Sequence, residues 1–191
     1  MNQIRAFIAL DLPPSIQQTL EKQTAPLRQS LGEDFVRWVS PHNMHLTLKF
    51  LGQVSALHLD FLKQTLTRAA DSHPGFDLQI GGLGSFPNSK RIRVLWVGVH
   101  APAALASLQQ AIESATAQLG YDKEERPFSP HLTLGRIRQG INTNSIQKIR
   151  ETLEKIQLGR IGTARVDSIH LYRSDRAGGT LYTKLFSAPL R

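Results

Sequence analysis

The chain of 191 residues contains no cysteine. Disulfide bonds and thiolate catalysis are therefore excluded, and the absence of cysteine agrees with a cytoplasmic location, which we expect. No stretch approaches the ~18 consecutive apolar residues of a membrane-spanning helix, so no membrane partner is expected. The segment 1–11 holds one arginine and a short apolar run, and no signal-peptide cleavage pattern follows it.

Acidic residues are also few relative to basic ones. The chain has 15 Asp and Glu against 23 Lys and Arg, giving a net charge of +8 and a pI near 10.2. The basic excess is present in both halves of the sequence, which suits a groove better than a detachable tail. Such a charge favours a polyanionic partner, with nucleic acid first. No coiled-coil heptads or long apolar stretches indicate a protein partner, so we expect a monomer.

One tetrapeptide occurs twice. Residues 45–48 and 131–134 both read His-Leu-Thr-Leu, and a Ser-Pro pair stands shortly before each copy. In a β-strand, His and Thr project from one face and the two leucines from the other. Two such strands side by side would place two imidazoles and two hydroxyls around one point, which is a suitable cradle for a phosphate.

The remaining pattern predicts alternating strands and helices. Period-two and continuous apolar segments predict strands near 4–10, 35–39, 45–51, 76–80, 94–99, 131–134, 165–172 and 181–186. Helical spacing appears over 13–27, 55–70, 102–119 and 142–156, and 174–179 is predicted as a turn. The order approximates β-α-β-β-α-β given twice, which indicates an internal duplication.

We therefore expect an α+β fold in which residues 1–191 form a single bilobal domain, since no linker is long enough to separate two domains. The two lobes, each a β-α-β-β-α-β-like unit, would contribute one motif strand apiece. Two antiparallel sheets would then form a central cleft with the helices outside.

The chemistry of the paired motif follows from its side chains. Hydrolysis of a phosphodiester needs an activated water on one side of phosphorus and a protonated leaving oxygen on the other. Two imidazoles with pKa values near ~6.5 can supply both at neutral pH. The hydroxyls of Thr47 and Thr133 can donate hydrogen bonds to the non-bridging oxygens and stabilise the developing charge.

A metal centre is not expected. The motif histidines, His45 and His131, lack the helical spacing of zinc ligands, and no acidic residue falls within either motif. Asp11 is the only carboxylate that follows a strong predicted strand. We therefore predict neither a metal nor another cofactor.

The sequence resembles the two-histidine (2H) phosphoesterases, and within them the bacterial and archaeal RNA 2′,3′-cyclic phosphodiesterases, also called 2′-5′ RNA ligases. The paired motifs, the length and the basic charge carry this resemblance. So do IRAFIAL at 4–10, RWV at 37–39, HLTLKFLG at 45–52 and SPHLTLGR at 129–136. The resemblance covers nearly the whole chain, and no motif position departs from the family pattern.

The resemblance implies an enzyme, an RNA 2′,3′-cyclic 3′-phosphodiesterase. It would hydrolyse a 2′,3′-cyclic phosphate at an RNA end or on a nucleotide to a 2′-phosphate without a metal. Reversible 2′-5′ ligation would use the same site. By the same resemblance, His45 is the general acid toward the leaving 3′ oxygen and His131 is the general base on water.

Two further substrate-binding residues, Phe50 and Arg136, are implied by the resemblance, which has them hold a nucleobase between ring and guanidinium. Each lies five positions after its histidine, and this odd offset predicts the opposite strand face. A strand end or a bulge at Gly135 would return Arg136 to the cleft. The alternatives are a core position for Phe50 and a solvated surface position for Arg136.

Two other functions stay open. One is a phosphoesterase acting on a small cyclic nucleotide such as ADP-ribose 1″,2″-cyclic phosphate. The other is a non-catalytic binder of RNA ends, against which the intact histidines and threonines argue. The remaining histidines, which have no partner motif, are expected in a loop, on the surface or at helix ends: His42, His58, His73, His100 and His170.

Overall fold

The structure is a computed structural model that describes residues 3–89, 91–175 and 181–191. Most of the turn predicted at 174–179 lies outside these residues. The strands are β1 (Gln3–Asp11), β2 (Val36–Trp38), β3 (His45–Ser55), β4 (Phe76–Phe86), β5 (Val94–His100), β6 (His131–Ile137), β7 (Arg160–Val166), β8 (Ser168–Asp175) and β9 (Leu181–Pro189). The helices are α1 (Pro14–Phe35), α2 (Leu59–Asp71), α3 (Ala103–Gln118) and α4 (Thr143–Lys155), with short 3-10 turns η1 (Pro41–Asn43) and η2 (Ala56–His58).

Within the described residues, one curved antiparallel sheet contains all nine strands in the order β7-β4-β5-β6-β3-β1-β8-β9, with β2 paired to β6. The expectation of two separate sheets is wrong. Leu46 of β3 pairs with Leu132 of β6, so the two motif strands join what would otherwise be two sheets. The physical reason is that this pairing satisfies backbone groups that two separate sheet edges would leave open.

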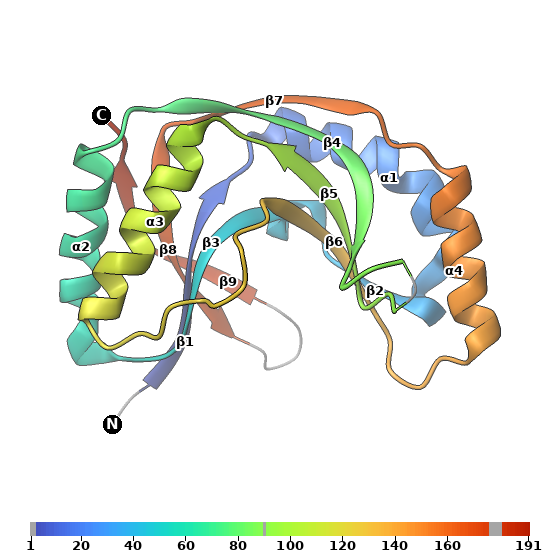
Figure 1. The fold of residues 1–191 in the computed structure, drawn as a ribbon, viewed down its shortest axis with the longest axis horizontal. Helices are drawn as coiled ribbons and strands as arrows, with labels where there is room; N and C mark the ends of the chain where they lie inside the picture. The colour runs from blue at the N-terminus through green and yellow to red at the C-terminus, as the bar shows by residue number, and fades with distance from the viewer. Residues whose placement is uncertain (1–2, 90, 176–180) are drawn as a thin grey trace.

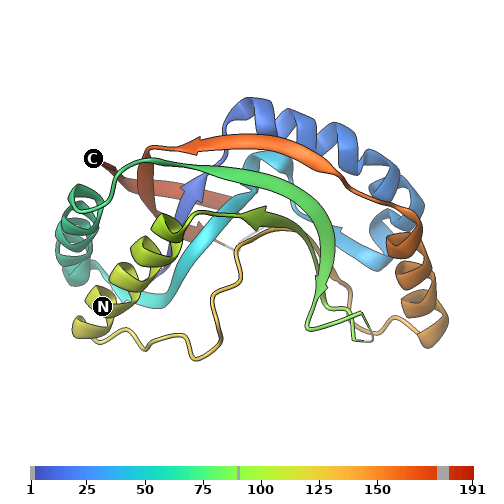
Figure 2. The same cartoon turned by 45° about the horizontal axis from the view of Figure 1, so that its top comes forward.

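The helices cover the outer side of the curved sheet in two pairs (Figures 1 and 2). Helices α2 and α3 pack together beside β3, β8 and β9, which with β1 we call the β3 flank. Helices α1 and α4 pack together beside β2 and β7, which with β4, β5 and β6 we call the β6 flank. No helix lies against the inner side of the sheet, opposite these two pairs (Figures 1 and 2).

The duplicated β-α-β-β-α-β order is only partly correct. Helix α1 follows β1 along the chain but packs on the β6 flank, whereas α3 follows β5 but packs beside α2 and β3. The second half has no counterpart of β2, because residues 120–130 contain no strand. The segment expected as one strand over 165–172 is broken at Asp167 into the end of β7 and the start of β8. The two flanks are therefore not successive halves of the sequence.

The motif leucines anchor this arrangement from the core side. All four are buried, and they belong to one continuous core that lies between the sheet and the helices: Leu46, Leu48, Leu132 and Leu134. Burying a leucine side chain contributes about 1.5–3 kcal/mol, so each motif strand is held strongly in one facing. A shift by one residue would turn the leucines into the cleft.

Gly135 marks the place where β2 packs tightly on β6. A Cβ atom there would lie 2.5 Å from Val36 Cγ1 and 3.0 Å from Trp38 Cε3. We predict that Gly135→Ala destabilises the protein by about 1–3 kcal/mol because β2 must move. The melting temperature should fall by roughly 2–4 °C per kcal/mol. Gly159→Ala is the control, since its Cβ would enter open space; equal melting temperatures for the two variants would contradict the prediction.

Candidate active site

Both motif histidines lie on the inner face of the sheet. His45 and Thr47 are partly exposed while the alternating leucines are buried, and His131 and Thr133 show the same pattern on β6. The antiparallel register around the Leu46–Leu132 pair places His45 beside Thr133 and Thr47 beside His131. The structure therefore brings together the four side chains that the repeated tetrapeptide predicts.

The two imidazoles are oriented by equivalent hydrogen bonds. Nδ1 of His45 donates to the carbonyl oxygen of Asn43 at 2.8 Å, and Nδ1 of His131 donates to that of Ser129 at 2.7 Å. A carbonyl only accepts, so Nδ1 carries the hydrogen in each neutral ring. Nε2 is thereby left as the atom that takes or gives a proton, and both rings present the same chemistry.

Aromatic rings hold the histidines further in place. Phe7 stacks on the His45 ring with centroids 4.7 Å apart, and Tyr182 meets that ring edge-on at 5.1 Å. On the β6 flank, Phe86 meets the His131 ring edge-on at 4.8 Å. Sequence reasoning missed Phe7 and Tyr182 and gave Phe86 only a place on a rim that could meet the RNA backbone, because these residues come from other strands and nothing in the local pattern links them to the motifs.

The two histidines differ in their electrostatic surroundings. Burial lowers the pKa of His45, while the Asn43 carbonyl and the Asp11 carboxylate act in the opposite direction. Burial also lowers the pKa of His131; there the Ser129 carbonyl opposes the shift and the positive charge of Arg136 adds to it. The Asp11 carboxylate therefore favours the protonated form of His45, and the Arg136 guanidinium favours the neutral form of His131.

Asp11 lies opposite His45 in the β1–β3 ladder, and three side chains surround its carboxylate. Tyr172 Oη donates to Oδ1 at 2.6 Å, Lys184 Nζ donates to Oδ2 at 2.6 Å, and His170 Nε2 lies 3.5 Å from Oδ2. Burial would raise the pKa of Asp11, but the hydrogen bonds from Lys184 and Tyr172 lower it below its ordinary value. The carboxylate is therefore ionised at neutral pH.

The surface position expected for His170 is wrong, because this histidine is buried and bonded to Ser187.

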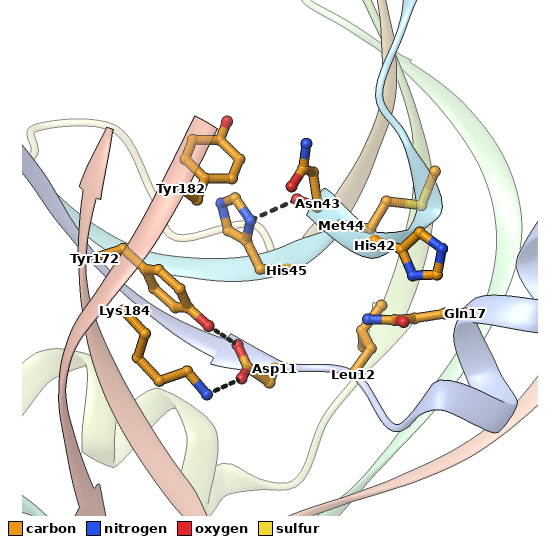
Figure 3. Close-up of a pocket in the computed structure, with 10 residues that line it drawn as sticks. All are labelled: Asp11, Leu12, Gln17, His42, Asn43, Met44, His45, Tyr172, Tyr182 and Lys184. Carbon is orange, nitrogen blue, oxygen red and sulfur yellow. Dashed lines mark hydrogen bonds and ion pairs between the residues drawn. The ribbon is translucent and has the colours of Figure 1, made fainter. Parts of the chain in front are cut away.

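A pocket of about 220 Å³ lies beside His45 (Figure 3). It is bounded by the end of β1, the start of α1, η1 and the β8–β9 pair, so it extends the inner face past the histidine. Its lining residues are Asp11, Leu12, Gln17, His42, Asn43, Met44, His45, Tyr172, Tyr182 and Lys184. Across the described ranges, no three His, Asp or Glu side chains are grouped so that they could hold a metal ion.

Phe50 and Arg136 return to the inner face through two matching bulges. In β3 the pairing with β1 skips Leu48, and in β6 the pairing with β5 skips Leu134. Two successive residues are then buried in each strand, and the following side chain points into the cleft. Phe50 is 61% exposed, so the core alternative for this residue is wrong.

The bulge in β3 has a second consequence. Lys49 is buried on the outer side, where its ammonium donates to Glu113 Oε2 at 2.6 Å and to the carbonyl oxygen of Asp122. Although Lys49 and Arg136 both follow a motif, only Arg136 faces the cleft.

Phe50 and Arg136 lie on opposite sides of the Leu46–Leu132 pair. Each lies four residues past the Leu46–Leu132 pair, but the strands are antiparallel and the residues are on opposite sides of it. Their Cα atoms would be about 20 Å apart along straight strands with one bulge each. The clamp on one base that the resemblance implied stays a prediction.

The fold and the site define a class of α+β proteins in which two His-x-Thr strands meet in one antiparallel sheet. Comparison with known proteins identifies the family. The model of the 2′-5′ RNA ligase superfamily matches residues 12–178. The chain belongs to this family, and the resemblance noted in its sequence is confirmed.

Among the described residues, no helix combines the length and hydropathy needed to cross a membrane.

Particular relatives cover nearly the whole chain. An RNA 2′,3′-cyclic phosphodiesterase of Methanothermobacter thermautotrophicus is 31% identical over 95% of this chain and 96% of its own. One from Thermotoga maritima is 30% identical over 96% and 94%. The crystal structure of Escherichia coli LigT complexed with 3′-AMP superposes with a TM-score of 0.79 at 30% identity, covering 99% of both chains. LigT has also been crystallised with ATP.

The histidine geometry predicts a specific tautomer. At about pH 8, above the pKa of both rings, His45 and His131 should be neutral. Each ring should then carry its hydrogen on Nδ1 and none on Nε2, because each Nδ1 donates to a carbonyl oxygen. Long-range ¹H–¹⁵N correlation spectra distinguish the two tautomers, with the exposed His100 as an internal reference. Protonation at Nε2 in either motif histidine would contradict the assigned hydrogen bonds.

Proposed function

We propose that this protein is a metal-independent RNA 2′,3′-cyclic phosphodiesterase that produces a 2′-phosphate. The observation that carries this proposal is the pair of equivalently oriented histidines on one face, each with a threonine of the neighbouring motif strand beside it. Membership of the family and the full-length relatives named RNA 2′,3′-cyclic phosphodiesterases support the same substrate class.

The reaction requires two proton transfers across phosphorus. Nε2 of His131 accepts a proton from water as the water oxygen bonds to phosphorus. The bond from phosphorus to the 3′ oxygen breaks, and Nε2 of His45 donates its proton to that oxygen. With a 5′-hydroxyl in place of water, the same transfers would form a 2′-5′ linkage.

The charges around the two rings support this division of roles. Asp11 favours the protonated state that a general acid needs at His45, and Arg136 favours the neutral state that a general base needs at His131. Thr47 and Thr133 would donate hydrogen bonds to the non-bridging oxygens, where negative charge grows in the transition state.

The two bulged residues would hold the rest of the substrate. The exposed ring of Phe50 offers a stacking surface for a nucleobase, worth on the order of 1–3 kcal/mol and tolerant of any base. Arg136 supplies positive charge on the opposite side of the Leu46–Leu132 pair. We propose that they contact the substrate separately.

Activity in the absence of metal tests the proposal. The substrate is an oligoribonucleotide that ends in a 2′,3′-cyclic phosphate, in buffer containing EDTA. Wild type should turn over, whereas His45→Ala and His131→Ala should each lose at least about 10²-fold in rate, as expected for loss of a general acid or base. His100→Ala, an exposed histidine at the end of β5, is the control and should keep wild-type activity. A wild type that is inert in EDTA, or two active motif variants, would disprove the mechanism.

The pH profile of kcat/KM tests which histidine is the acid. A general base works above its pKa; Arg136 lowers that of His131, so Arg136→Ala should raise it and move the acidic limb to higher pH. A general acid works below its pKa; Asp11 raises that of His45, so Asp11→Asn should lower it and move the alkaline limb to lower pH. If Arg136→Ala moved the alkaline limb instead, the roles of the histidines would be reversed.

A further inference from the structure

Two arginines lie directly opposite one another where β2 pairs with β6. Arg37 is the register partner of Arg136, and Val94 of β5 is the partner of Arg136 on the other side. Directly opposed residues in an antiparallel pair project from the same face of the sheet. Because the bulge in β6 turns Arg136 to the inner face, Arg37 also projects from the face that carries the two histidines.

The neighbours of Arg37 in β2 confirm this facing. Val36 is buried, and both Val36 and Trp38 contact the space where a Cβ of Gly135 would lie, on the core side of β6. Trp38 also packs on the core side, where its Nε1 donates to the carbonyl oxygen of Gly32 in α1 at 3.0 Å. The residue between them, Arg37, is exposed and must therefore project to the inner side.

The charge of this arginine pair is not neutralised. No carboxylate of the described residues lies within ion-pair distance of either guanidinium, and Arg93, exposed just before β5, has none either. Arg93 lies on the adjoining segment, since its carbonyl oxygen accepts from the amide of Ile137. On the β3 flank, Lys184 is bonded to the Asp11 carboxylate, whereas the exposed Arg5 of β1 has no ion pair among the described residues.

Like charges directly opposite in a sheet destabilise it. An anion between the guanidiniums would remove that repulsion, and a phosphodiester is the anion that arginine binds with the best geometry. We propose that Arg37, together with Arg136, binds an internucleotide phosphate of an RNA strand whose cyclic end lies between the histidines. This inference rests on the proposed function.

The bound phosphate is distinct from the reacting one. Arg136 lies four residues past the Leu46–Leu132 pair, about 10 Å along the strand with its one bulge, and Arg37 lies directly opposite Arg136. A mononucleotide has no second phosphodiester to place there. The arginine pair therefore predicts a preference for an RNA end over a free cyclic nucleotide, and it directs the strand toward β2.

Substrate length tests this inference. We would compare kcat/KM for a tetranucleotide ending in adenosine 2′,3′-cyclic phosphate with that for adenosine 2′,3′-cyclic phosphate itself. Arg37→Ala should lower the ratio of the two values about 10-fold, as expected for one lost charge-assisted hydrogen bond. Arg37→Lys should restore part of it. The slope of log kcat/KM against log salt for the tetranucleotide should shrink by about 0.7, the value for one phosphate contact in a single strand.

The matched control is Arg68→Ala, an exposed arginine on α2 in the β3 flank, which should leave the ratio unchanged. An unchanged ratio in Arg37→Ala, with a wild type that hydrolyses both substrates, would overturn the phosphate site and leave the proposed function intact. An equal loss on both substrates would also overturn it, because a phosphate contact affects only the longer one. A wild type that hydrolyses neither would instead disprove the proposed function.

Discussion

The pairing of Leu46 with Leu132 is the contact on which the rest of the site depends. It closes two groups of strands into one sheet, and it sets two copies of the same tetrapeptide in antiparallel register. The leucines are buried toward the helices, so the histidines and threonines can only face the open inner side. A single backbone pairing, supported by an apolar core, thus brings together four polar side chains from distant parts of the chain.

The two bulges extend this site without disturbing the core. Each bulge buries two successive residues and returns the following side chain to the cleft. Gly135 fits at the second bulge because β2 lies too close for a side chain, whereas the first bulge places Lys49 in a buried ion pair with Glu113. The two bulges have the same form but different results. The bulge in β3 buries the lysine that follows its motif, whereas the bulge in β6 turns Arg136 toward the cleft.

The two histidines have equivalent hydrogen bonds but different charged neighbours. Equivalent carbonyl hydrogen bonds give both rings the same tautomer. Their charged neighbours differ, with a carboxylate near one ring and an arginine near the other. Arg37, the register partner of Arg136, likewise has no carboxylate partner among the described residues, while Lys184 near His45 is bonded to Asp11. The directly opposed arginines are the feature by which the β6 end of the cleft suits a phosphodiester.

The amino-acid sequence by itself determined which residues form the centre of the site. In each copy of the repeat, apolar and polar residues alternate, so one face of the strand carries both leucines. Burying the leucines is favourable, and this decides that the histidine and threonine point away from the core. The positions of most strands and helices followed from the same periodicity. Only the tertiary structure decided that the sheet is continuous, that α1 and α3 pack on the opposite flanks, and that Phe50 and Arg136 lie at opposite ends. Those features depend on pairings between distant segments, and on two bulges that no local pattern specifies. The same holds for Asp11, Phe7 and Arg37, which reach the site through neighbouring strands.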